Sequence, residues 1–464
     1  MENHQKPSPY TRAIVEYVNR TDFDDLPHEA IETAKLHSLD ALGIMLGAYG
    51  AGHALVKGLI ELALEERVKR EASLVGSGER VGCVDAAMVN AVMCNFLDFS
   101  DGHFMGGHIN DRLVPVALAA AERVNASGRD FLTAIVLGYE VYCDLAYTFF
   151  RKVEPAEVKL PLFVMLGTLA GVVPAGKLLR LNEEQLAGAM GLAASIQIGG
   201  AQYVLSGGHE KDLCAGHESR RALLSVLMAQ KGILGSKNIL EAERGVLSAL
   251  GAEPPQSPSL GREYRIGECY IKPYPACRYL HASIEAAMNL VREYGIRASG
   301  VEKAIVTTNR SSASRNSYEI NSHVNAIFSH AYQVATVLVE GKPSLPVAWK
   351  QKVQDPLFRA LLQRIEVKAD PKYEVMFERR SVRQPPWPAH VQVHVRDGQA
   401  FASEVLSPKG DPGNPMTPAE VKDKFMHLAG ITLSESRASE IMGMVDHLES
   451  IPKVSNLAVL LAVR

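Results

Sequence analysis

His390-Val-Gln-Val-His-Val395 is the clearest strand signal in a chain whose other patterns are mostly helical. Apolar and polar side chains alternate strictly along it, which is typical of a half-buried strand. Asp397-Gly398 follows as a tight-turn signal, and Ala400–Leu406 is the expected returning strand. Ala304-Ile-Val-Thr-Thr308 is rich in β-branched residues and predicts a further strand.

Helical patterns surround these strands. Ala282–Tyr294 and Ala326–Val339 predict helices in the same region, so residues 266–410 are expected to form a smaller α+β domain. Residues 1–265 are rich in Ala, Leu and Gly, with few strand-like segments, and they predict a large all-helical domain. The predicted fold class is therefore mainly α with a smaller α+β domain.

Start signals place several of the helices. Pro27 opens one of them, and Asn182 to Gln185 has the spacing of a capping box. The proline- and glycine-rich stretch Ser407–Pro415 predicts a loop. Thr417 to Glu420 then supplies a cap, a first-turn proline and a capping-box glutamate. Residues 411–464 consequently read as helices that return to the first domain.

Composition excludes several function classes. The chain has 464 residues, 47% of them hydrophobic, and a formal net charge of −3. Disorder as the main state is excluded by the apolar content, and a nucleic-acid partner is disfavoured because cations are not in excess. Six scattered cysteines without a CxxC pair favour a reducing compartment. The uncharged run Leu160–Gly176 contains helix breakers and predicts a buried helix rather than a membrane span. A cytoplasmic location is expected.

One loop gathers acid–base groups. Asn95–His108 contains Asp98, Asp101, His103 and His108 among several glycines. A carboxylate and an imidazole held together in a cleft can exchange protons with a substrate. The plainer interpretation is a loop of solvated acids and exposed histidines. A metal site built from the same four residues is less favoured, since no ligand spacing supports it.

Two later segments carry cations. Lys211 follows glycines at a charged turn, where it could contact a substrate carboxylate or simply be solvated. Lys272 and Arg278 lie in a proline-stiffened segment on either side of Cys277. That segment suits anion binding, with Arg278 able to grip a carboxylate in bidentate fashion. The plainer interpretation is an interdomain linker stiffened by proline. It lies where the two sequence textures meet, a favoured place for a ligand pocket.

These segments, in this order, resemble the MmgE/PrpD family, which includes 2-methylcitrate dehydratase, cis-aconitate decarboxylase and iminodisuccinate epimerase. The similar stretches cover nearly the whole chain: Ala72–Arg80, Leu97–Asp101 with His108 and Pro115, Lys211 with Ala215-Gly216, Lys272–Arg278, and Asn414–Thr417. The resemblance implies a helical domain built from both chain ends, an inserted α+β lid and a homodimer, without a metal or an organic cofactor. It carries over Asp98, His108, Lys211 and Lys272 as active-site positions between the domains.

The chain departs from the family pattern at three places. Ser100 and Gly102 stand in the acidic loop where the family usually has a second acid and a threonine. Val158–Pro161 lacks a histidine that is common there, and Cys214 replaces another. These changes put the family's standard substrate in doubt more than its fold.

The leading functional hypothesis is a cofactor-free lyase of the dehydratase type, acting on a di- or tricarboxylate such as a 2-methylcitrate-like acid. Lys211, Lys272 and Arg278 would hold carboxylates and stabilise the developing charge. His108 and Asp98 would move the proton, and His103 would assist the departing hydroxyl. Alternatives are a decarboxylase, an epimerase or isomerase that uses Cys214 or Cys277 as a second proton carrier, and an inactive dimeric binding protein.

Overall fold

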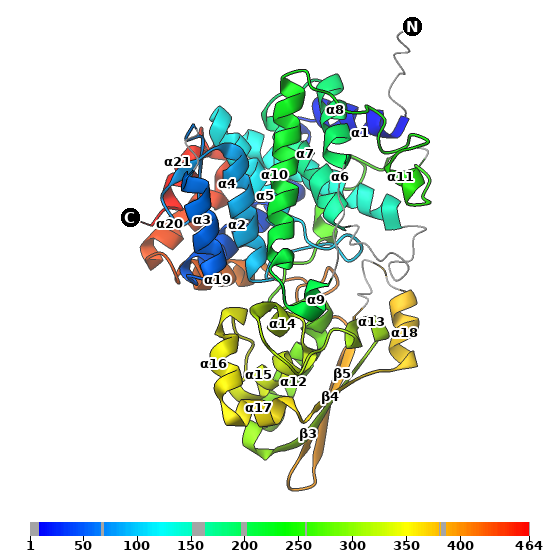
Figure 1. Ribbon diagram of the computed structural model, residues 1–464, viewed down its shortest axis with the longest axis vertical. Coiled ribbons are helices and arrows are strands. Elements are labelled where there is room, and N and C mark those ends of the chain that lie inside the picture. The colour runs from blue at the N-terminus through cyan, green and yellow to red at the C-terminus, as the bar shows by residue number, and fades with distance from the viewer. Residues whose placement is uncertain are drawn as a thin grey trace.

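The computed structural model describes residues 9–65, 69–150, 163–195, 202–255, 258–379, 381 and 387–463. Two bodies are visible, a large helical one above and a smaller α+β one below (Figure 1). This arrangement confirms the predicted fold class. The junction between the bodies contains the segment that follows η2 (Arg265–Glu268) and the loop that leads into α19.

The helical body contains helices from both ends of the chain. Its main helices are α1 (Pro9–Arg20), α2 (His28–Gly50), α3 (Ala54–Glu65), α4 (Cys83–Phe96), α5 (Asn110–Val124), α6 (Gly128–Phe150), α7 (Phe163–Leu178), α8 (Glu183–Ala194), α10 (Glu210–Gln230), α19 (Pro418–Ala429), α20 (Glu435–Asp446) and α21 (Ser455–Leu460). Short elements complete it, namely β1 (Ala72–Ser73), β2 (Arg80–Val81), α9 (Tyr203–Ser206) and α11 (Val246–Ala249).

Small residues let these helices approach closely. Ala117 and Ala120 of α5 are fully buried. A Cβ added at Gly171 of α7 would lie 2.9 Å from the Cβ of Ala222 on α10. On the other side of α10, a Cβ at Gly216 would lie 2.6 Å from Val92 of α4. Helix α10 is therefore packed between α4 and α7, and this packing fixes the position of its first turn.

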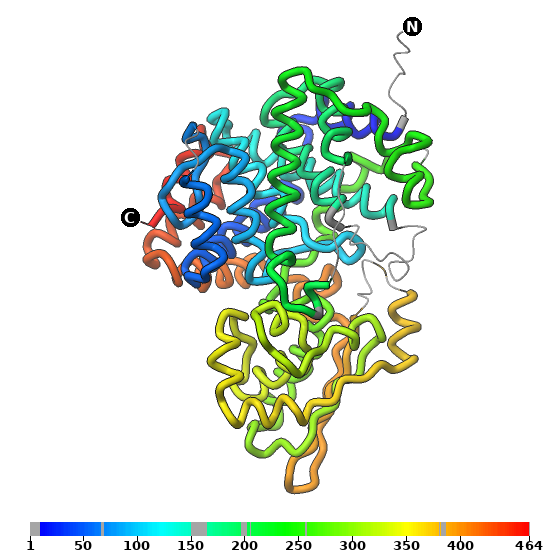
Figure 2. The backbone as a smooth tube through the Cα atoms, in the orientation of Figure 1, coloured from blue at the N-terminus to red at the C-terminus, as the bar shows by residue number. Residues whose placement is uncertain are grey.

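The C-terminal helices lie against the N-terminal ones (Figure 2). Helix α19 packs on α2, where Cβ atoms at Gly43 and Gly47 would each lie 3.0 Å from Phe425 or Leu428. The Thr417–Glu420 capping box and the one at Asn182–Gln185 are both present. The α+β body is thus inserted between two parts of one helical body.

The α+β body contains one mixed sheet with helices packed on it. Its strands are β3 (Val301–Thr308), β4 (Ile365–Ala369), β5 (Ala389–Val395) and β6 (Ala400–Val405). Its helices are α12 (His281–Tyr294), α13 (Arg310–Ala313), α14 (His323–Ile327), α15 (His330–Glu340), α16 (Trp349–Gln354), α17 (Pro356–Leu362) and α18 (Pro371–Glu378). The strand order is β4-β3-β5-β6, with β3 and β4 parallel and the other pairs antiparallel.

The strand predictions are confirmed with small changes at the ends. Strands β5 and β6 form the predicted hairpin, in which Val395 donates its amide N–H to the carbonyl of Gln399 at 3.0 Å. The helical pattern predicted at Ala326–Val339 is divided instead between α14 and α15. Ser329 causes the break, because its side chain accepts the amide of Tyr332 and so starts a new helix.

The uncharged run contributes to the buried helix α7, whose Leu166, Leu169 and Val173 are fully buried. Among the described residues, no helix is by itself long and apolar enough to cross a membrane, and only α2 with α3 meets that test as a bent pair.

Candidate active site

The loop between α4 and α5 is shaped by backbone constraints. Asp98 adopts a φ of +50°, a conformation uncommon for a residue with a side chain. Its amide N–H donates to the carbonyl of Asn95 at 2.9 Å. Four residues later, Gly102 exchanges backbone hydrogen bonds with Tyr270, at 3.1 and 2.8 Å. The loop is thereby joined to the segment that carries Lys272.

Two lysines from distant parts of the chain meet at the Asp98 carboxylate. The Nζ atom of Lys211, in the first turn of α10, lies 3.0 Å from Oδ1, and the Nζ atom of Lys272 lies 3.0 Å from Oδ2. Lys211 also donates to the carbonyl of Asn95 at 2.8 Å, and Lys272 donates to that of Asp98 at 2.9 Å. All three charged side chains are at least 95% buried. Opposite charges at this separation, shielded from water, attract strongly.

His108 is the fourth member of this group, and its hydrogen bonds define its tautomer. Its Nδ1 lies 2.6 Å from the hydroxyl oxygen of Ser100, and that hydroxyl donates to Asp111 at 3.3 Å. Because the serine proton is committed to Asp111, Nδ1–H of the imidazole donates to Ser100. The lone pair is then on Nε2, which lies 3.6 Å from Oδ1 of Asp98.

The charges of the group set its proton affinities. Burial, reinforced by the ammonium of Lys272, lowers the pKa of His108 to about 3. Burial opposes ionisation of Asp98, but Lys211 and Lys272 outweigh it and hold the pKa of that carboxyl well below its usual range. Burial lowers the pKa of Lys272, whereas for Lys211 the neighbouring carboxylates outweigh burial and raise the pKa. At neutral pH the group is a neutral base beside two ammonium ions and one carboxylate.

Two buried cations that the sequence analysis does not single out, Arg112 and Lys424, support this group. Arg112 donates to Asp111 at 2.6 Å and to Glu218 at 2.9 and 3.1 Å. Lys424 of α19 donates to the carbonyl oxygens of Phe99 and Lys272, at 2.8 and 2.9 Å. Arg112 directly follows the Asn110-Asp111 pair after His108, which is a usable signal. Lys424 is an ordinary helical lysine in sequence, so only the tertiary structure identifies it.

The other predicted residues have different surroundings. His103 is fully buried with Nε2 3.7 Å from Glu268, and its ring contacts Phe104 and Tyr147. The contacts described for His103 do not include Asp98, Lys211 or Lys272. The proposed substrate role of His103 stays a prediction.

Cys277 and Arg278 lie at the end of the segment that begins with Lys272. The guanidinium of Arg278 pairs with Asp411 and donates to the carbonyl of Lys409 at 3.2 Å, which ties the segment to the loop before α19. Cys277 is buried near Asp98 and Lys272, and burial raises the pKa of its thiol. The thiol is therefore protonated at neutral pH. The carboxylate-gripping role of Arg278 and the substrate contact of Cys277 stay predictions.

The structure describes the surroundings of two of the three places where the chain departs from the family pattern. A Cβ at Gly102 would lie 2.5 Å from the hydroxyl of Tyr270 and 2.5 Å from the carbonyl of Gly107, so a larger residue requires these neighbours to move. The thiol of Cys214 donates to the carbonyl of Lys211 at 3.0 Å, and burial raises its pKa to about 12. The third departure, Val158–Pro161, lies outside the described residues.

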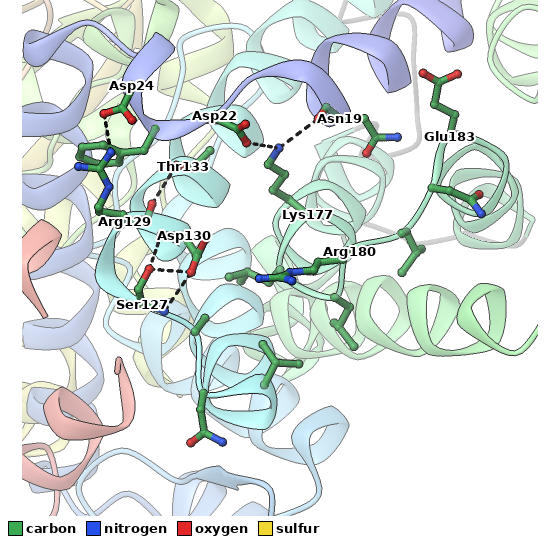
Figure 3. Close-up of a pocket in the computed structure, with 18 residues that line it drawn as sticks. Asn19, Asp22, Asp24, Ser127, Arg129, Asp130, Thr133, Lys177, Arg180 and Glu183 are labelled. Atoms are coloured by element: carbon green, nitrogen blue, oxygen red, sulfur yellow. Dashed lines mark hydrogen bonds and ion pairs between the residues drawn. The ribbon is translucent and has the colours of Figure 1, made fainter. Parts of the chain in front are cut away.

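A separate groove lies on the helical body. A groove of about 1010 Å³ between α1, α5, α6, α7 and α8 (Figure 3) is called the surface groove below. Arg129 pairs with Asp24 there, and Lys177 lies 3.4 Å from Asp22. Asp24 and Asp22 are more than 80% exposed. The carboxylates of these pairs are solvated, in contrast to the buried carboxylate of Asp98.

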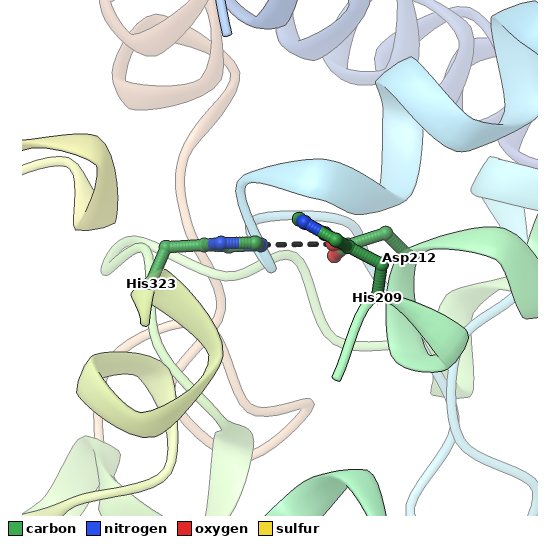
Figure 4. Close-up of side chains that lie close together, drawn as sticks. All are labelled: His209, Asp212 and His323. Atoms are coloured by element: carbon green, nitrogen blue, oxygen red, sulfur yellow. Dashed lines mark hydrogen bonds and ion pairs between the residues drawn. The ribbon is translucent and has the colours of Figure 1, made fainter. Parts of the chain in front are cut away.

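His209, Asp212 and His323 form a set that could hold a metal ion, with donor atoms within 4.8 Å of one another (Figure 4). The surrounding charge opposes this. Lys211 places its ammonium 3.9 Å from Asp212, and the set lies at the positive N-terminal end of α10. The three residues are already joined without an ion by hydrogen bonds to the Asp212 carboxylate.

Comparison with known proteins agrees with this architecture. Residues 12–258 match the MmgE/PrpD N-terminal domain, and residues 274–450 match the MmgE/PrpD C-terminal domain. Because the matches cover most of the chain, this protein belongs to the MmgE/PrpD family, and the resemblance seen in the sequence is confirmed.

Among its curated relatives are cis-aconitate decarboxylases. The chain is 26% identical to that of Aspergillus terreus, over 98% of this chain and 96% of the relative. It is 24% identical to the human cis-aconitate decarboxylase, over 81% and 79% of the two chains. It is 22% identical to the mouse cis-aconitate decarboxylase, over 97% and 93%.

Proposed function

We propose that this protein is a lyase for a small polycarboxylate, and that decarboxylation of cis-aconitate or a close analogue is its reaction. The observation that carries the proposal is the meeting of Lys211 and Lys272 at Asp98 beside the neutral imidazole of His108. Its relatives include cis-aconitate decarboxylases, which favours decarboxylation over the dehydration that the sequence alone favours. All of them are matched at low identity, so the substrate is proposed as a class.

The charge balance of the site suits a polyanion. Two ammonium ions and one carboxylate leave one net positive charge among Lys211, Lys272 and Asp98. Each ammonium has three N–H donors. Lys272 donates two of them, to the carbonyl and to Oδ2 of Asp98, whereas Lys211 donates one to the carbonyl of Asn95 and forms an ion pair with Oδ1 of Asp98. The remaining donors of the two lysines are the groups proposed to bind a substrate carboxylate. In a water-excluded site, such contacts stabilise charge that develops during reaction.

The proposed chemistry balances with one proton donor. In cis-aconitate, the bond between the methylene carbon and its carboxylate breaks and carbon dioxide leaves. The released electron pair forms a new double bond, while the old double bond takes a proton at its far carbon. A bound trianion adds negative charge beside His108 and raises its pKa, so that the imidazole can carry this proton. Asp98 holds both lysines in place during the step.

Dehydration is a second candidate that one observation favours. His108 in the unliganded protein is a neutral base with an available Nε2, as removal of a proton from carbon requires. The epimerase hypothesis from the sequence predicts α-hydrogen exchange without loss of carbon dioxide or water. The inactive-protein hypothesis predicts binding alone.

We further propose that the protein is a homodimer and is located in the cytoplasm. Light scattering on the purified protein tests whether it is a dimer.

The test is a product assay with purified protein and a panel of di- and tricarboxylates in deuterium oxide. We expect carbon dioxide and a dicarboxylate with one deuterium at the former alkene carbon. Loss of water from 2-methylcitrate without carbon dioxide would identify a dehydratase instead. Near-normal turnover in both His108→Ala and Lys272→Ala would contradict the proposed site.

A further inference from the structure

The α+β body contacts the helical body close to Lys211. His323, at the start of α14, directs its ring toward the first turn of α10 (Figure 4). Its Nε2 lies 2.8 Å from Oδ2 of Asp212, and Nδ1 of His209 lies 3.3 Å from the same oxygen. Asp212 and His323 are both at least 98% buried. The pair is therefore a shielded contact between two bodies rather than a solvated surface pair.

Aromatic rings hold His323 in this position. The ring of Phe96, at the end of α4, lies 4.7 Å from that of His323, and the ring of His53 lies 5.2 Å from it. The backbones are also close here, since a Cβ at Gly207 would lie 2.3 Å from the hydroxyl oxygen of Ser322. His323 is thus packed on two sides, and its position depends on how α14 is docked.

Asp212 connects this contact to the candidate active site. Its second oxygen, Oδ1, lies 3.9 Å from Nζ of Lys211. The same Nζ lies 3.0 Å from Oδ1 of Asp98. A continuous series of charged and hydrogen-bonded groups consequently runs from His323 on one body, through Asp212 and Lys211, to Asp98 on the other.

We propose that Asp212 is a positioning residue, which holds the Lys211 ammonium in its reactive place only while His323 of the docked α+β body fixes the Asp212 carboxylate. The inference rests on the proposed function, because it assigns Lys211 to the substrate site. Domain docking and completion of the site are then the same event. Substrate would enter when α14 is undocked and react when His323 has returned to Asp212.

The groups around the contact favour an anionic Asp212. Burial opposes its charge, but His209, His323 and Lys211 outweigh burial and hold its pKa below the usual range. The N-terminus of α10 acts in the same direction. His53 faces the rings of His209 and His323, and Lys350 of α16 adds a positive charge near it. Removing the carboxylate charge therefore releases several cationic or polar groups at once.

The first experiment needs no substrate. Hydrogen–deuterium exchange is measured for residues 203–213 and 320–328 in wild type, His323→Ala, His323→Gln and Asp212→Asn. We expect His323→Ala to speed exchange in both segments by about tenfold, since one charge-assisted hydrogen bond between the bodies is lost. Gln retains an N–H donor and should restore much of the protection. His217→Ala, an exposed position on the same helix, is the matched control.

The second experiment measures turnover of cis-aconitate by the same proteins and by Asp212→Glu. We expect Asp212→Asn and His323→Ala to lower kcat by about tenfold or more with KM changed less than about twofold, as misplacement of one reacting group predicts. Asp212→Glu and His323→Gln should recover part of kcat. A merely structural role would lower kcat only in step with the melting temperature.

The outcomes separate the two proposals. Wild-type protein that turns over none of the acids defeats the proposed function, and the exchange data then decide alone whether His323 and Asp212 join the bodies. Unchanged exchange in His323→Ala overturns the inference. So does normal kcat in Asp212→Asn when the wild type is active.

Discussion

The Asp98 cluster and the surface groove contain the same kinds of side chain in opposite surroundings. Lys272 and Asp98 are 0% and 1% exposed, whereas Lys177 and Asp22 of the groove are 17% and 82% exposed. The groove has a volume of about 1010 Å³, and its ion pairs are screened by water. At the Asp98 cluster, burial is the largest cause of the lowered pKa of His108.

Matched lysine substitutions should give the largest contrast. Lys272→Met removes a buried ammonium that we propose to stabilise developing charge, and we expect kcat/KM for cis-aconitate to fall by about a thousandfold or more. Lys177→Met in the groove should leave kcat/KM within about twofold. Carbon dioxide release measures both. A thousandfold loss in the groove variant, with little loss in Lys272→Met, would exchange the roles of the two regions.

Substitution of Asp98 should destabilise the protein far more than substitution of Asp22. Asp98→Asn leaves Lys211 and Lys272 buried without their shared carboxylate, and we expect the free energy of unfolding to fall by about 3–5 kcal/mol. Asp22→Asn at the exposed pair should change it by no more than experimental error. Urea unfolding followed by fluorescence measures the difference. Equal, small effects would mean that the Asp98 cluster is as solvated as the groove.

Glycine substitutions test how tightly the loop between α4 and α5 is packed. Gly102→Ala places a Cβ 2.5 Å from Tyr270 and Gly107, so we expect the free energy of unfolding to fall by about 1–3 kcal/mol. Gly58→Ala in α3 meets no atom within 4 Å and should instead stabilise the helix by about 0.5–1 kcal/mol. Thermal unfolding checks both signs. A stabilising Gly102→Ala would show a loop with room to spare.

The smallest expected effect is the pH dependence due to His108. Its pKa is about 3 in the folded protein, below the ordinary value near 6.5, so the unfolded chain binds a proton in the interval between them. The stabilising contribution of neutral His108 is fully present above pH 6.5 and is lost as the pH falls toward 3. Replacing His108 by Gln should flatten the fall in unfolding free energy between pH 6.5 and 5.5 by about 1 kcal/mol. The comparison variant is His28→Gln, which replaces a largely exposed histidine.

Local signals in the sequence predict local structure well. The alternation at 390–395 and the Asp397-Gly398 turn predict the β5–β6 hairpin, and the Thr417 and Asn182 caps mark real helix starts. The break between α14 and α15 at Ser329 was missed, because a single serine in a helical pattern is weak evidence for a new cap.

Signals for the site are of a different kind. Local patterns single out Asp98, His108, Lys211 and Lys272 as candidates, and the family resemblance is what favours a functional interpretation for all four. The meeting of the two lysines at one carboxylate is a tertiary fact. Asp212 has no local signal, since its importance comes from contacts with His323 on another body.

A crystal structure with bound cis-aconitate, or with a non-reacting tricarboxylate, would show directly whether the Asp98 cluster binds the substrate. We expect substrate carboxylate oxygens within about 3 Å of Nζ of Lys211 and Lys272, with the alkene carbon facing Nε2 of His108. A tricarboxylate bound in the surface groove at Arg129 and Lys177, with the Asp98 cluster unchanged, would contradict it.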